Sequence, residues 1–242
     1  MKQTGKTTGT FYFKRFKVED GNSTMRVGTD AVLLGASVEV SGVGNILEIG
    51  TGCGVIALML AQRSQALIDA IDIDEASVVQ AGRNVRNSPW NDRIRVIHNS
   101  LQDYTHKANQ QYDLIVCNPP YFSRSLKSPV KTRNIARHHD TLSFTELLEG
   151  SAKLMTDTGS LWVILPIMEY KEFIETAALK GFFLQYKMMI TSLENKEYQR
   201  IILQLKTIPA EDIREKFLAI KTADQSFSKE YIELTGEFYL DF

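Results

Sequence analysis

Ile46-Leu47-Glu48-Ile49-Gly50-Thr51-Gly52-Cys53-Gly54 is the stretch that decides the fold of this 242-residue chain. It has the pattern of an apolar strand followed by a glycine-rich turn, and the next segment, Val55 to Ala61, has the composition of a buried helix. A strand, a glycine-rich turn and a helix in this order form a cofactor crevice at the carboxyl end of a parallel sheet. The glycine spacing is G-x-G-x-G, whereas dinucleotide sites use G-x-G-x-x-G, so the stretch argues against a nicotinamide enzyme.

The next predicted strand, Ala66 to Ile73, carries Asp72 near its end, and Asp74 directly follows it. Asp72 lies 22 residues after Gly50, and a carboxylate about 20 residues beyond such a turn is where a cofactor ribose is hydrogen-bonded. Asp74 is the rival position for this role. We expect Asp74 instead to cap the following helix, residues 75–87, because Asp is a strong N-cap residue.

The turn Asn118-Pro119-Pro120-Tyr121 directly follows the apolar run Leu114 to Cys117. Two prolines remove two N–H donors and disfavour a helix, so this strand must open into an extended turn that presents carbonyl acceptors. An aromatic amine or amide is a better nucleophile when acceptors hold its N–H bonds, and the Asn118 side chain and the Pro119 carbonyl are suited to this role. Tyr121 is suited to stack on a planar substrate. The turn therefore points to methyl transfer onto a planar amino group, although alone it is equally compatible with a tight turn carrying a core tyrosine.

With these motifs the chain resembles the class I S-adenosylmethionine-dependent methyltransferases, through the loop Glu48–Gly54, the acid Asp72 and the turn Asn118–Tyr121. Further segments are similar to the bacterial valine-tRNA adenine-N(6)-methyltransferases: Phe11–Phe16, Arg26–Ala36 and Ala136-Arg137-His138. The resemblance covers most of residues 11–206. It implies S-adenosylmethionine as cofactor, a tRNA as substrate, and methyl transfer to the N(6) amine of an adenine, adenosine 37 beside the anticodon of a valine tRNA.

The resemblance also implies the fold. We expect an α/β, Rossmann-like class I methyltransferase with a mostly parallel seven-stranded twisted sheet, helices on both faces and an antiparallel last strand. The patterns after the Asn-Pro-Pro-Tyr turn fit this fold, with helices at Leu142–Leu154 and Tyr170–Leu179 and strands at Ser160–Leu165, Phe182–Ile190 and Tyr198–Leu205. We expect a single methyltransferase domain over residues 1–242, with an N-terminal extension, 1–40, and a C-terminal extension, 207–242, that packs back on it.

The resemblance assigns roles to individual residues. S-adenosylmethionine is expected over the glycine loop, with Asp72 on the ribose hydroxyls and Glu48 near the positively charged end of the methionine moiety. The acid that often contacts the cofactor adenine in such enzymes is replaced here by Ser100. We therefore expect either Ser100 or Asp103 to contact the cofactor adenine. The expected cofactor-binding residues are Glu48, Gly50, Thr51, Gly52, Gly54, Asp72, Ser100, Asp103 and Asn118. The expected catalytic residues are Asn118, Pro119, Pro120 and Tyr121.

The positive charges are unevenly distributed, although the formal net charge is only −1. Residues 1–18 and residues 122–139 each contain five Lys or Arg side chains and no acid. Such segregation is typical of a phosphate-binding face, whereas most charge runs are solvated tails and loops. We favour phosphate binding because the second run begins immediately after the catalytic turn. The expected substrate-binding residues are Arg124, Lys127, Lys131, Arg133, Arg137 and His138.

Composition excludes several classes of protein. A hydrophobic content of 43% over 242 residues suits one large α/β core, and no apolar run approaches the ~20 residues of a membrane span. We therefore expect a cytoplasmic protein without a membrane partner. Cys53 and Cys117 are too few for a metal site, and the four histidines lack metal-ligand spacing, so no metal is expected. The sequence does not fix the oligomeric state, and a monomer is expected.

Three alternatives stay open at this point. A protein-glutamine N5-methyltransferase uses the same Asn-Pro-Pro-Tyr chemistry on a side-chain amide, but the basic segment counts against it. An rRNA or DNA amino-group methyltransferase is closer still. A non-catalytic RNA-binding module that retains the fold is the third alternative, and it would not bind S-adenosylmethionine.

Overall fold

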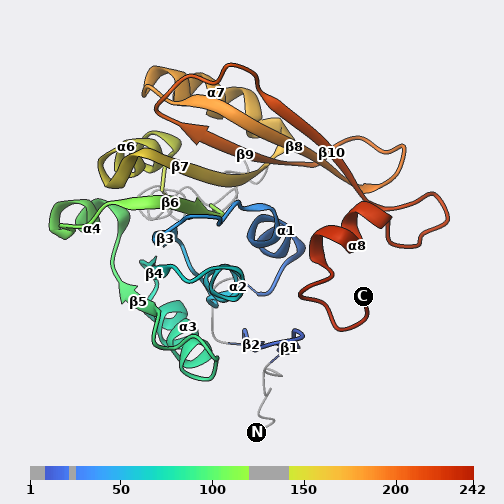
Figure 1. The fold of residues 1–242 in the computed structure, drawn as a ribbon, viewed down its shortest axis with the longest axis horizontal. Helices are drawn as coiled ribbons and strands as arrows, with labels where there is room; N and C mark the ends of the chain where they lie inside the picture. The colour runs from blue at the N-terminus through green and yellow to red at the C-terminus, as the bar shows by residue number, and fades with distance from the viewer. Residues whose placement is uncertain (1–8, 22–25, 120–141) are drawn as a thin grey trace, which may run out of the picture.

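The computed structural model describes residues 9–21, 26–119 and 142–242. Its main sheet contains β3 (Asn45–Ile49), β4 (Leu67–Asp72), β5 (Ile94–His98), β6 (Tyr112–Cys117), β7 (Met155–Pro166), β8 (Phe183–Leu193), β9 (Arg200–Lys206) and β10 (Arg214–Lys221). Within the described residues these strands form one sheet in the order β10-β8-β9-β7-β6-β3-β4-β5 (Figure 1). The helices are α1 (Thr29–Ser37), α2 (Val55–Arg63), α3 (Glu75–Arg86), α4 (Leu101–Lys107), α6 (Phe144–Leu154), α7 (Tyr170–Leu179) and α8 (Lys229–Thr235), with the short 3-10 helix η1 (Ile167–Glu169).

Helices cover both faces of the sheet, because successive side chains of each strand point to opposite sides. Ile46 packs in a cluster with side chains of α1, α2 and α8, whereas its neighbour Leu47 packs with side chains of α4, α6 and α7. Figure 1 shows α1 and α2 on one side of the central strands and α6 and α7 on the other. The predicted α/β class with a mainly parallel, doubly covered sheet is confirmed.

The sequence predicts a seven-stranded sheet with an antiparallel last strand, whereas the described sheet has eight strands. β9 pairs antiparallel with both β7 and β8, as the expected antiparallel last strand should. The sheet described here has an eighth strand, because β10 pairs parallel with the edge of β8. The sequence gives β10 only a weak signal, since its first four residues are exposed and Leu218 is its one buried side chain. An edge strand needs few apolar residues when one partner and one helix cover it.

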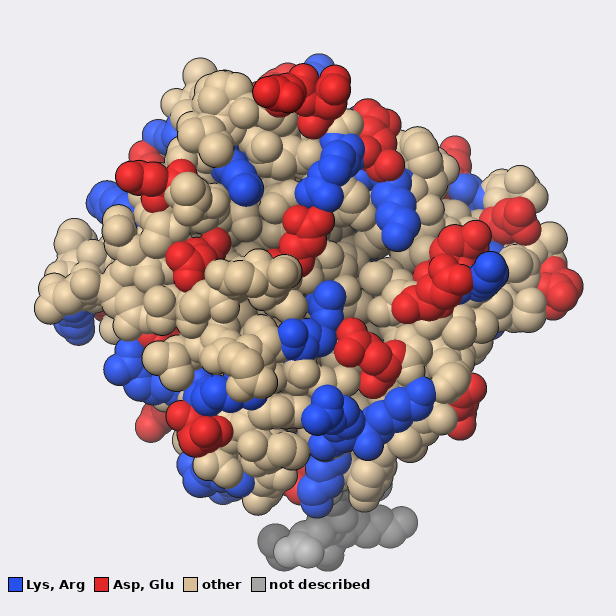
Figure 2. Space-filling model, viewed as in Figure 1, with Lys and Arg blue, Asp and Glu red and all other residues tan. Residues whose placement is uncertain are grey.

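The N-terminal residues form a separate antiparallel hairpin of β1 (Thr10–Tyr12) and β2 (Lys17–Glu19). Figure 2 shows basic side chains gathered over this hairpin. Among the described residues of the first basic run, Lys14, Arg15 and Lys17 are exposed. Lys14 nevertheless has a structural role, since its Nζ donates to the carbonyl oxygens of Gly236 and Phe242, each at 2.6 Å. These two bonds fasten the C-terminal residues to the hairpin.

The C-terminal extension packs back on the rest of the protein, as predicted. Tyr231 and Phe238 are buried in the same apolar cluster as α1 and α2. Phe13 and Phe16 of the hairpin stack at 4.5 Å between ring centroids, and Tyr239 stacks on Phe13 at 6.1 Å. In the described part of the chain, no helix combines the length and the apolar character that crossing a membrane requires.

Candidate active site at the carboxyl edge of the sheet

The glycine loop between β3 and α2 depends on a left-handed backbone at each of its three glycines. The φ angles of Gly50, Gly52 and Gly54 are 73°, 55° and 82°, a region that residues with a side chain rarely adopt. A Cβ atom at Gly54 would also lie 3.3 Å from the Cβ of Ala81 on α3. The G-x-G-x-G spacing is therefore required by the backbone conformation of this turn.

Asp72, at the end of β4, holds the glycine loop in place. Its Oδ2 accepts a hydrogen bond from the Gly52 N–H at 2.8 Å, and its Oδ1 accepts one from the Asp74 N–H at 2.9 Å. Burial raises the pKa of the Asp72 carboxyl. Each oxygen has a second lone pair, so the carboxylate can still accept hydrogen bonds from a ligand.

The prediction that Asp74 caps a helix is confirmed. Asp74 is the N-cap of α3, and its Oδ2 accepts a hydrogen bond from the Ser77 N–H at 2.8 Å. This bond satisfies one of the free N–H groups in the first turn of α3. The two acids are therefore used differently, since Asp72 faces the glycine loop and Asp74 supports α3.

Glu48 is a buried carboxyl beneath the glycine loop, with 1% of its surface exposed. Its Oε2 accepts hydrogen bonds from the Thr51 hydroxyl at 2.6 Å and the Ala57 N–H at 3.1 Å. Its Oε1 is buried without a hydrogen-bond partner among the described residues. Burial raises the pKa of Glu48 to about 8. With this pKa the carboxyl is largely neutral at pH 7, and Oε1 becomes an open acceptor when the proton leaves, so a cation placed here would be bound favourably with release of that proton.

Asn118 is a second buried acceptor at the same edge of the sheet. It directly follows β6, whose last residue, Cys117, pairs with Ile49 of β3 and with Val163 of β7. The Asn118 side-chain oxygen is buried and has no hydrogen-bond partner among the described residues. The next residue, Pro119, is buried as well. The two open acceptors, Glu48 and Asn118, thus come from adjacent parallel strands, and parallel strands end at one edge.

The loop after β5 brings Ser100 and Asp103 to this edge. The Asn99 N–H donates to the Asp72 carbonyl at 3.0 Å, which ties the loop to the end of β4. Ser100 is the N-cap of α4, and its Oγ accepts a hydrogen bond from the Asp103 N–H at 3.0 Å. The Ser100 hydroxyl therefore keeps its own hydrogen to donate, while the Asp103 side chain is exposed.

Several predicted site residues lie outside the described residues. They are Pro120 and Tyr121 of the catalytic turn and the substrate-binding set Arg124, Lys127, Lys131, Arg133, Arg137 and His138. Their roles stay predictions.

Asn84 is a residue of this region that the motifs did not single out. Its Nδ2 donates to the Cys53 carbonyl of the glycine loop and to the Glu19 carbonyl of β2, each at 2.8 Å, and its Oδ1 accepts from the Glu19 N–H at 3.0 Å. One buried amide therefore ties the N-terminal hairpin to the glycine loop. The available signal was a polar residue three positions after Ala81 on the face of α3 that packs against the loop.

The two cysteines are packing residues of this region. Cys53 and Cys117 are free and buried, and burial raises the pKa of both thiols, that of Cys53 to about 12. Both are therefore neutral thiols, unsuited to act as nucleophiles at ordinary pH. In the ranges that the structure describes, no group of three His, Cys, Asp or Glu side chains is arranged to hold a metal ion.

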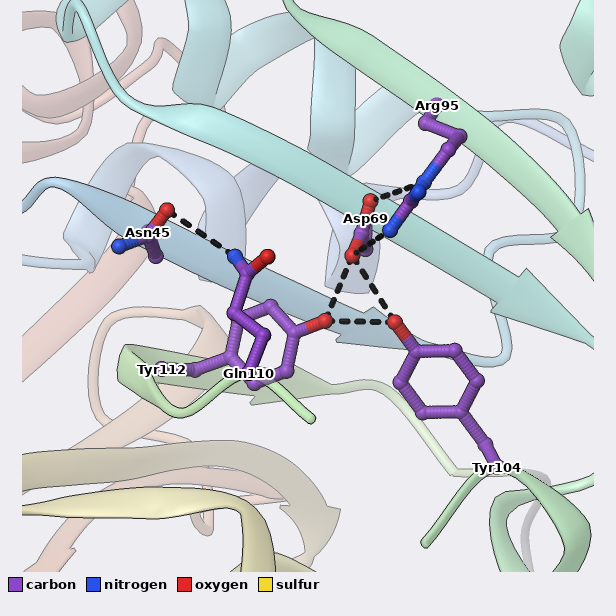
Figure 3. Close-up of polar contacts among 6 residues, drawn as sticks. All are labelled: Asn45, Asp69, Arg95, Tyr104, Gln110 and Tyr112. Atoms are coloured by element: carbon purple, nitrogen blue, oxygen red, sulfur yellow. Dashed lines mark hydrogen bonds and ion pairs between the residues drawn. The ribbon is translucent and has the colours of Figure 1, made fainter. Parts of the chain in front are cut away.

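A second buried carboxylate lies farther from the edge, on the other face of the sheet. Figure 3 shows Asp69 of β4 between Arg95 of β5 and the hydroxyls of Tyr104 and Tyr112, which come from α4 and β6. Arg95 donates two hydrogen bonds to Asp69, at 2.8 and 2.7 Å, and the Tyr112 and Tyr104 hydroxyls donate at 2.6 and 2.9 Å. Burial alone would raise the pKa of Asp69, but these hydrogen bonds outweigh it and lower the pKa.

Comparison with known proteins assigns this arrangement to a family. The family model of the methyltransferase small domain matches residues 22–198. A relative from Trichodesmium erythraeum, a tRNA1(Val) (adenine(37)-N6)-methyltransferase, is 43% identical over 96% of this chain and 98% of its own length. The chain therefore belongs to the family of tRNA1(Val) (adenine(37)-N6)-methyltransferases. A relative of the same name from Phocaeicola vulgatus is 44% identical, with 96% of this chain and 97% of the relative covered.

Solved structures of methyltransferases support the fold assignment. A predicted O-methyltransferase from Agrobacterium tumefaciens superposes with a TM-score of 0.66 at 17% identity, covering 86% of this chain and 96% of that one. A putative RNA methyltransferase from Pyrococcus horikoshii gives a TM-score of 0.53 at 16% identity, covering 74% and 81% of the two chains. The resemblance to methyltransferases seen in the sequence is confirmed, and the protein is a methyltransferase.

Proposed function

We propose that this protein transfers a methyl group from S-adenosylmethionine to the N(6) amine of an adenine in tRNA, adenosine 37 beside the anticodon of a valine tRNA. The observation that carries the proposal is a pair of buried acceptors that have no partner among the described residues, Glu48 Oε1 and Asn118 Oδ1, at one edge of the sheet. The first suits a cationic cofactor, and the second suits an amine that is about to be methylated. The names of the relatives support the same substrate.

The residues at this edge fit S-adenosylmethionine, which supplies a methyl group on a positively charged sulfur. The three glycines with left-handed backbone conformation carry no side chains, so a ligand can approach the backbone of the loop closely. Glu48 is placed to accept hydrogen bonds from the cationic end of the cofactor, and Asp72 has lone pairs for the ribose hydroxyls. Ser100 or Asp103 supplies the contact with the cofactor adenine.

Asn118 holds the amine of the target base. Its side-chain oxygen accepts an N–H of the amine, and this contact strengthens as the nitrogen gains positive charge in the transition state. The Pro119 carbonyl is the second acceptor, and Pro120 with Tyr121 completes the turn and supports the ring. The adenine must leave its stack for its amine to line up with the methyl group. No general base is assigned, because the proton becomes acidic only after the nitrogen has been methylated.

The proposed partner is a tRNA, and the proposed compartment is therefore the cytoplasm, where tRNA is modified. Arg124, Lys127, Lys131, Arg133, Arg137 and His138 are proposed to contact its phosphates, since they follow the catalytic turn in sequence. We propose no metal and no membrane partner, and a monomer as the active form.

The test is single-turnover transfer of labelled methyl from S-adenosylmethionine to valine tRNA, followed by nucleoside analysis. We expect N(6)-methyladenosine in the wild-type tRNA and no label in a matched tRNA with guanosine at position 37. Parallel reactions should contain DNA, rRNA and a protein mixture as acceptors. Label on DNA, rRNA or a protein glutamine in place of tRNA would overturn the substrate assignment, and failure to bind S-adenosylmethionine in calorimetry would favour a non-catalytic RNA-binding module.

A further inference from the structure

We propose that Tyr198 and Phe217 form a stacking site for unpaired bases of the tRNA loop that contains the target adenosine. The inference rests on the proposed function, because it adds a second contact with the same RNA. Tyr198 lies just before β9 and Phe217 lies in β10, yet their ring centroids are 5.8 Å apart at an angle of 40°. Tyr198 and Phe217 are 37% and 53% exposed, respectively. We call these two residues the aromatic pair.

Tyr198 lies near the edge of the sheet that carries Asn118, and Phe217 lies within the outermost strand, β10, two strands beyond β9. Val163 of β7 pairs with Cys117 on one side and with Leu203 of β9 on the other. Because β9 is antiparallel to β7, its first residues lie at the edge where β6 and β7 end. From Asn118 to Tyr198 the path is about 10 Å across two strand spacings and about 13 Å along the strand direction. When the target adenine is at Asn118, a base a few nucleotides away in the same loop can reach Tyr198.

A further exposed apolar side chain, Met168, comes from the segment next to the start of β9. The Ile167 N–H, just after β7, donates to the Gln199 carbonyl at 3.0 Å, so the 3-10 helix η1 lies against the start of β9. Met168 in η1 is 84% exposed. Single exposed apolar residues are ordinary, but Tyr198 contacts Phe217, and Met168 comes from η1, which is hydrogen-bonded to the residue after Tyr198. Together they offer flat, apolar contacts beside a site that must accommodate an unstacked base.

The turn that carries Tyr198 is held rigidly by its own hydrogen bonds. The Gln199 N–H donates to the Ile190 carbonyl at 2.9 Å, and the Gln199 side-chain oxygen accepts from the Ser192 N–H at 3.0 Å. The Glu194 N–H donates to the Lys221 carbonyl at 2.8 Å, which joins the turn to the end of β10. A ring presented by an ordered turn loses little further conformational entropy when a ligand stacks on it.

The chemistry of the aromatic pair favours bases over phosphates. Arg200, the cation next to the turn, is engaged, since its Nε donates to Asp30 at 2.8 Å and its Nη1 donates to the Gln199 carbonyl at 3.1 Å. The adjoining turn carries acids as well as a lysine, at Glu194, Lys196 and Glu197, so it offers no excess of positive charge. Single-stranded RNA is bound by stacking of bases on aromatic side chains, largely without regard to sequence.

The experiment compares Tyr198→Ala and Phe217→Ala with Tyr198→Phe, using an anticodon stem-loop RNA with 2-aminopurine at unpaired positions near adenosine 37. Leu179→Ala is the matched control, because Leu179 is 85% exposed and lies at the end of α7. We expect each alanine variant of the pair to lower kcat/KM for the RNA by about tenfold to a hundredfold. The quenching of 2-aminopurine seen with the wild type should be lost, whereas Tyr198→Phe and Leu179→Ala should behave like the wild type.

Two further measurements separate stacking from other roles. The affinity for S-adenosylmethionine and the salt dependence of RNA binding should stay unchanged in Tyr198→Ala, since no phosphate contact is removed. If an alanine variant fails to fold, Tyr198→Leu keeps an apolar side chain without a ring and should show the same loss. Wild-type methylation of the RNA with unchanged kcat/KM in Tyr198→Ala or Tyr198→Leu would overturn the stacking site and leave the proposed function standing. Absence of methylation of full-length valine tRNA by the wild type would instead overturn the proposed function.

Discussion

Glu48 and Asp69 are both buried carboxylic acids, and they lie on neighbouring strands of the same sheet. In the pairing of β3 with β4, Glu48 lies opposite Ala70 and Asp69 lies opposite Leu47, so the two side chains point to opposite faces. Their exposed fractions are 1% and 6%. Their pKa values nevertheless move in opposite directions, upward to about 8 for Glu48 and downward for Asp69.

The difference lies in depth and in hydrogen-bond partners: burial raises the pKa of Glu48 more than its two hydrogen bonds lower it, whereas the hydrogen bonds and the charge of Arg95 outweigh burial at Asp69. Asp69 accepts two bonds from Arg95 and one from each of two tyrosine hydroxyls, so its charge is fully compensated within the protein. Glu48 has one oxygen without a partner among the described residues. A buried acid whose hydrogen bonds are all made within the protein has a structural role, whereas a buried acid with an open acceptor can bind a ligand. Asn118, with its open oxygen, belongs with Glu48 in this comparison.

The largest effect is expected for Asn118→Ala. Loss of one preorganised polar contact should lower the single-turnover rate of methyl transfer on the order of a hundredfold to a thousandfold, by analogy with oxyanion-hole donors. Affinities for S-adenosylmethionine and tRNA should change much less, because the contact strengthens only in the transition state. Asn118→Asp keeps an acceptor and should retain part of the activity. Full activity in Asn118→Ala would show that an open acceptor is no sign of function in this site.

Asp69→Leu tests the other side of the comparison. The change removes the acceptor that Arg95, Tyr104 and Tyr112 share. The two hydroxyls can still pair with each other, so one of them loses its acceptor, and the free energy of unfolding in urea should fall by about 3 kcal/mol. The folded variant should bind S-adenosylmethionine like the wild type. A weakened cofactor affinity without loss of stability would assign Asp69 to the functional site.

Glu48→Gln should weaken S-adenosylmethionine binding by ~1.5–3 kcal/mol, the range for hydrogen bonds to charged groups. The same change should not destabilise the protein without cofactor at pH 7, because Glu48, with a pKa of about 8, is mostly protonated there. Titration calorimetry in buffers of different ionisation enthalpy should detect proton release when the cationic cofactor binds to the wild type at pH 7. Identical proton release by Glu48→Gln would contradict the assignment.

The pH dependence of stability should show the two acids with opposite signs. The raised pKa of Glu48 means that its contribution is complete below its unfolded pKa of about 4.5 and is lost as the pH rises through about 8. The lowered pKa of Asp69 means that its contribution is present above its unfolded pKa of about 3.8 and is lost as the pH falls below it. Urea unfolding of the cofactor-free protein against pH, with Glu48→Gln and Asp69→Leu alongside, measures both. Glu48→Gln should remove the fall in stability between about pH 4.5 and 8, and Asp69→Leu should remove the fall below about pH 3.8. If the stability of both variants changed with pH as that of the wild type does, the pKa assignments would be wrong.

The smallest effect is expected for Asp74→Ala, which removes the cap of α3. The free energy of unfolding should fall by ~1 kcal/mol, and cofactor affinity should stay close to that of the wild type. Asp72→Ala is the matched change, and it should instead weaken cofactor binding. If calorimetry showed a larger loss of cofactor affinity for Asp74→Ala than for Asp72→Ala, the roles assigned to the two acids would be wrong.

Local features of this protein could be predicted from its sequence. The strand, turn and helix around Glu48–Gly54, the cap at Asp74 and helix α7 at Tyr170–Leu179 depend on residues close together in the chain. Glycine spacing, capping residues and hydrophobic periodicity encode backbone conformation over a few residues, so they can be read without a structure. The order of these elements then indicated the sheet and its functional edge.

Tertiary structure decided which polar groups are satisfied and which are open. Nothing near Asp69 in the sequence marks it as structural, because its tyrosine partners come from 35 and 43 residues away. The same holds for the bridge by Asn84, the eighth strand β10 and the contact of Tyr198 with Phe217. Hydrogen-bond satisfaction and ring contacts depend on side chains that only the completed fold brings together, so a sequence pattern cannot distinguish the compensated charge of Asp69 from the open acceptor of Glu48.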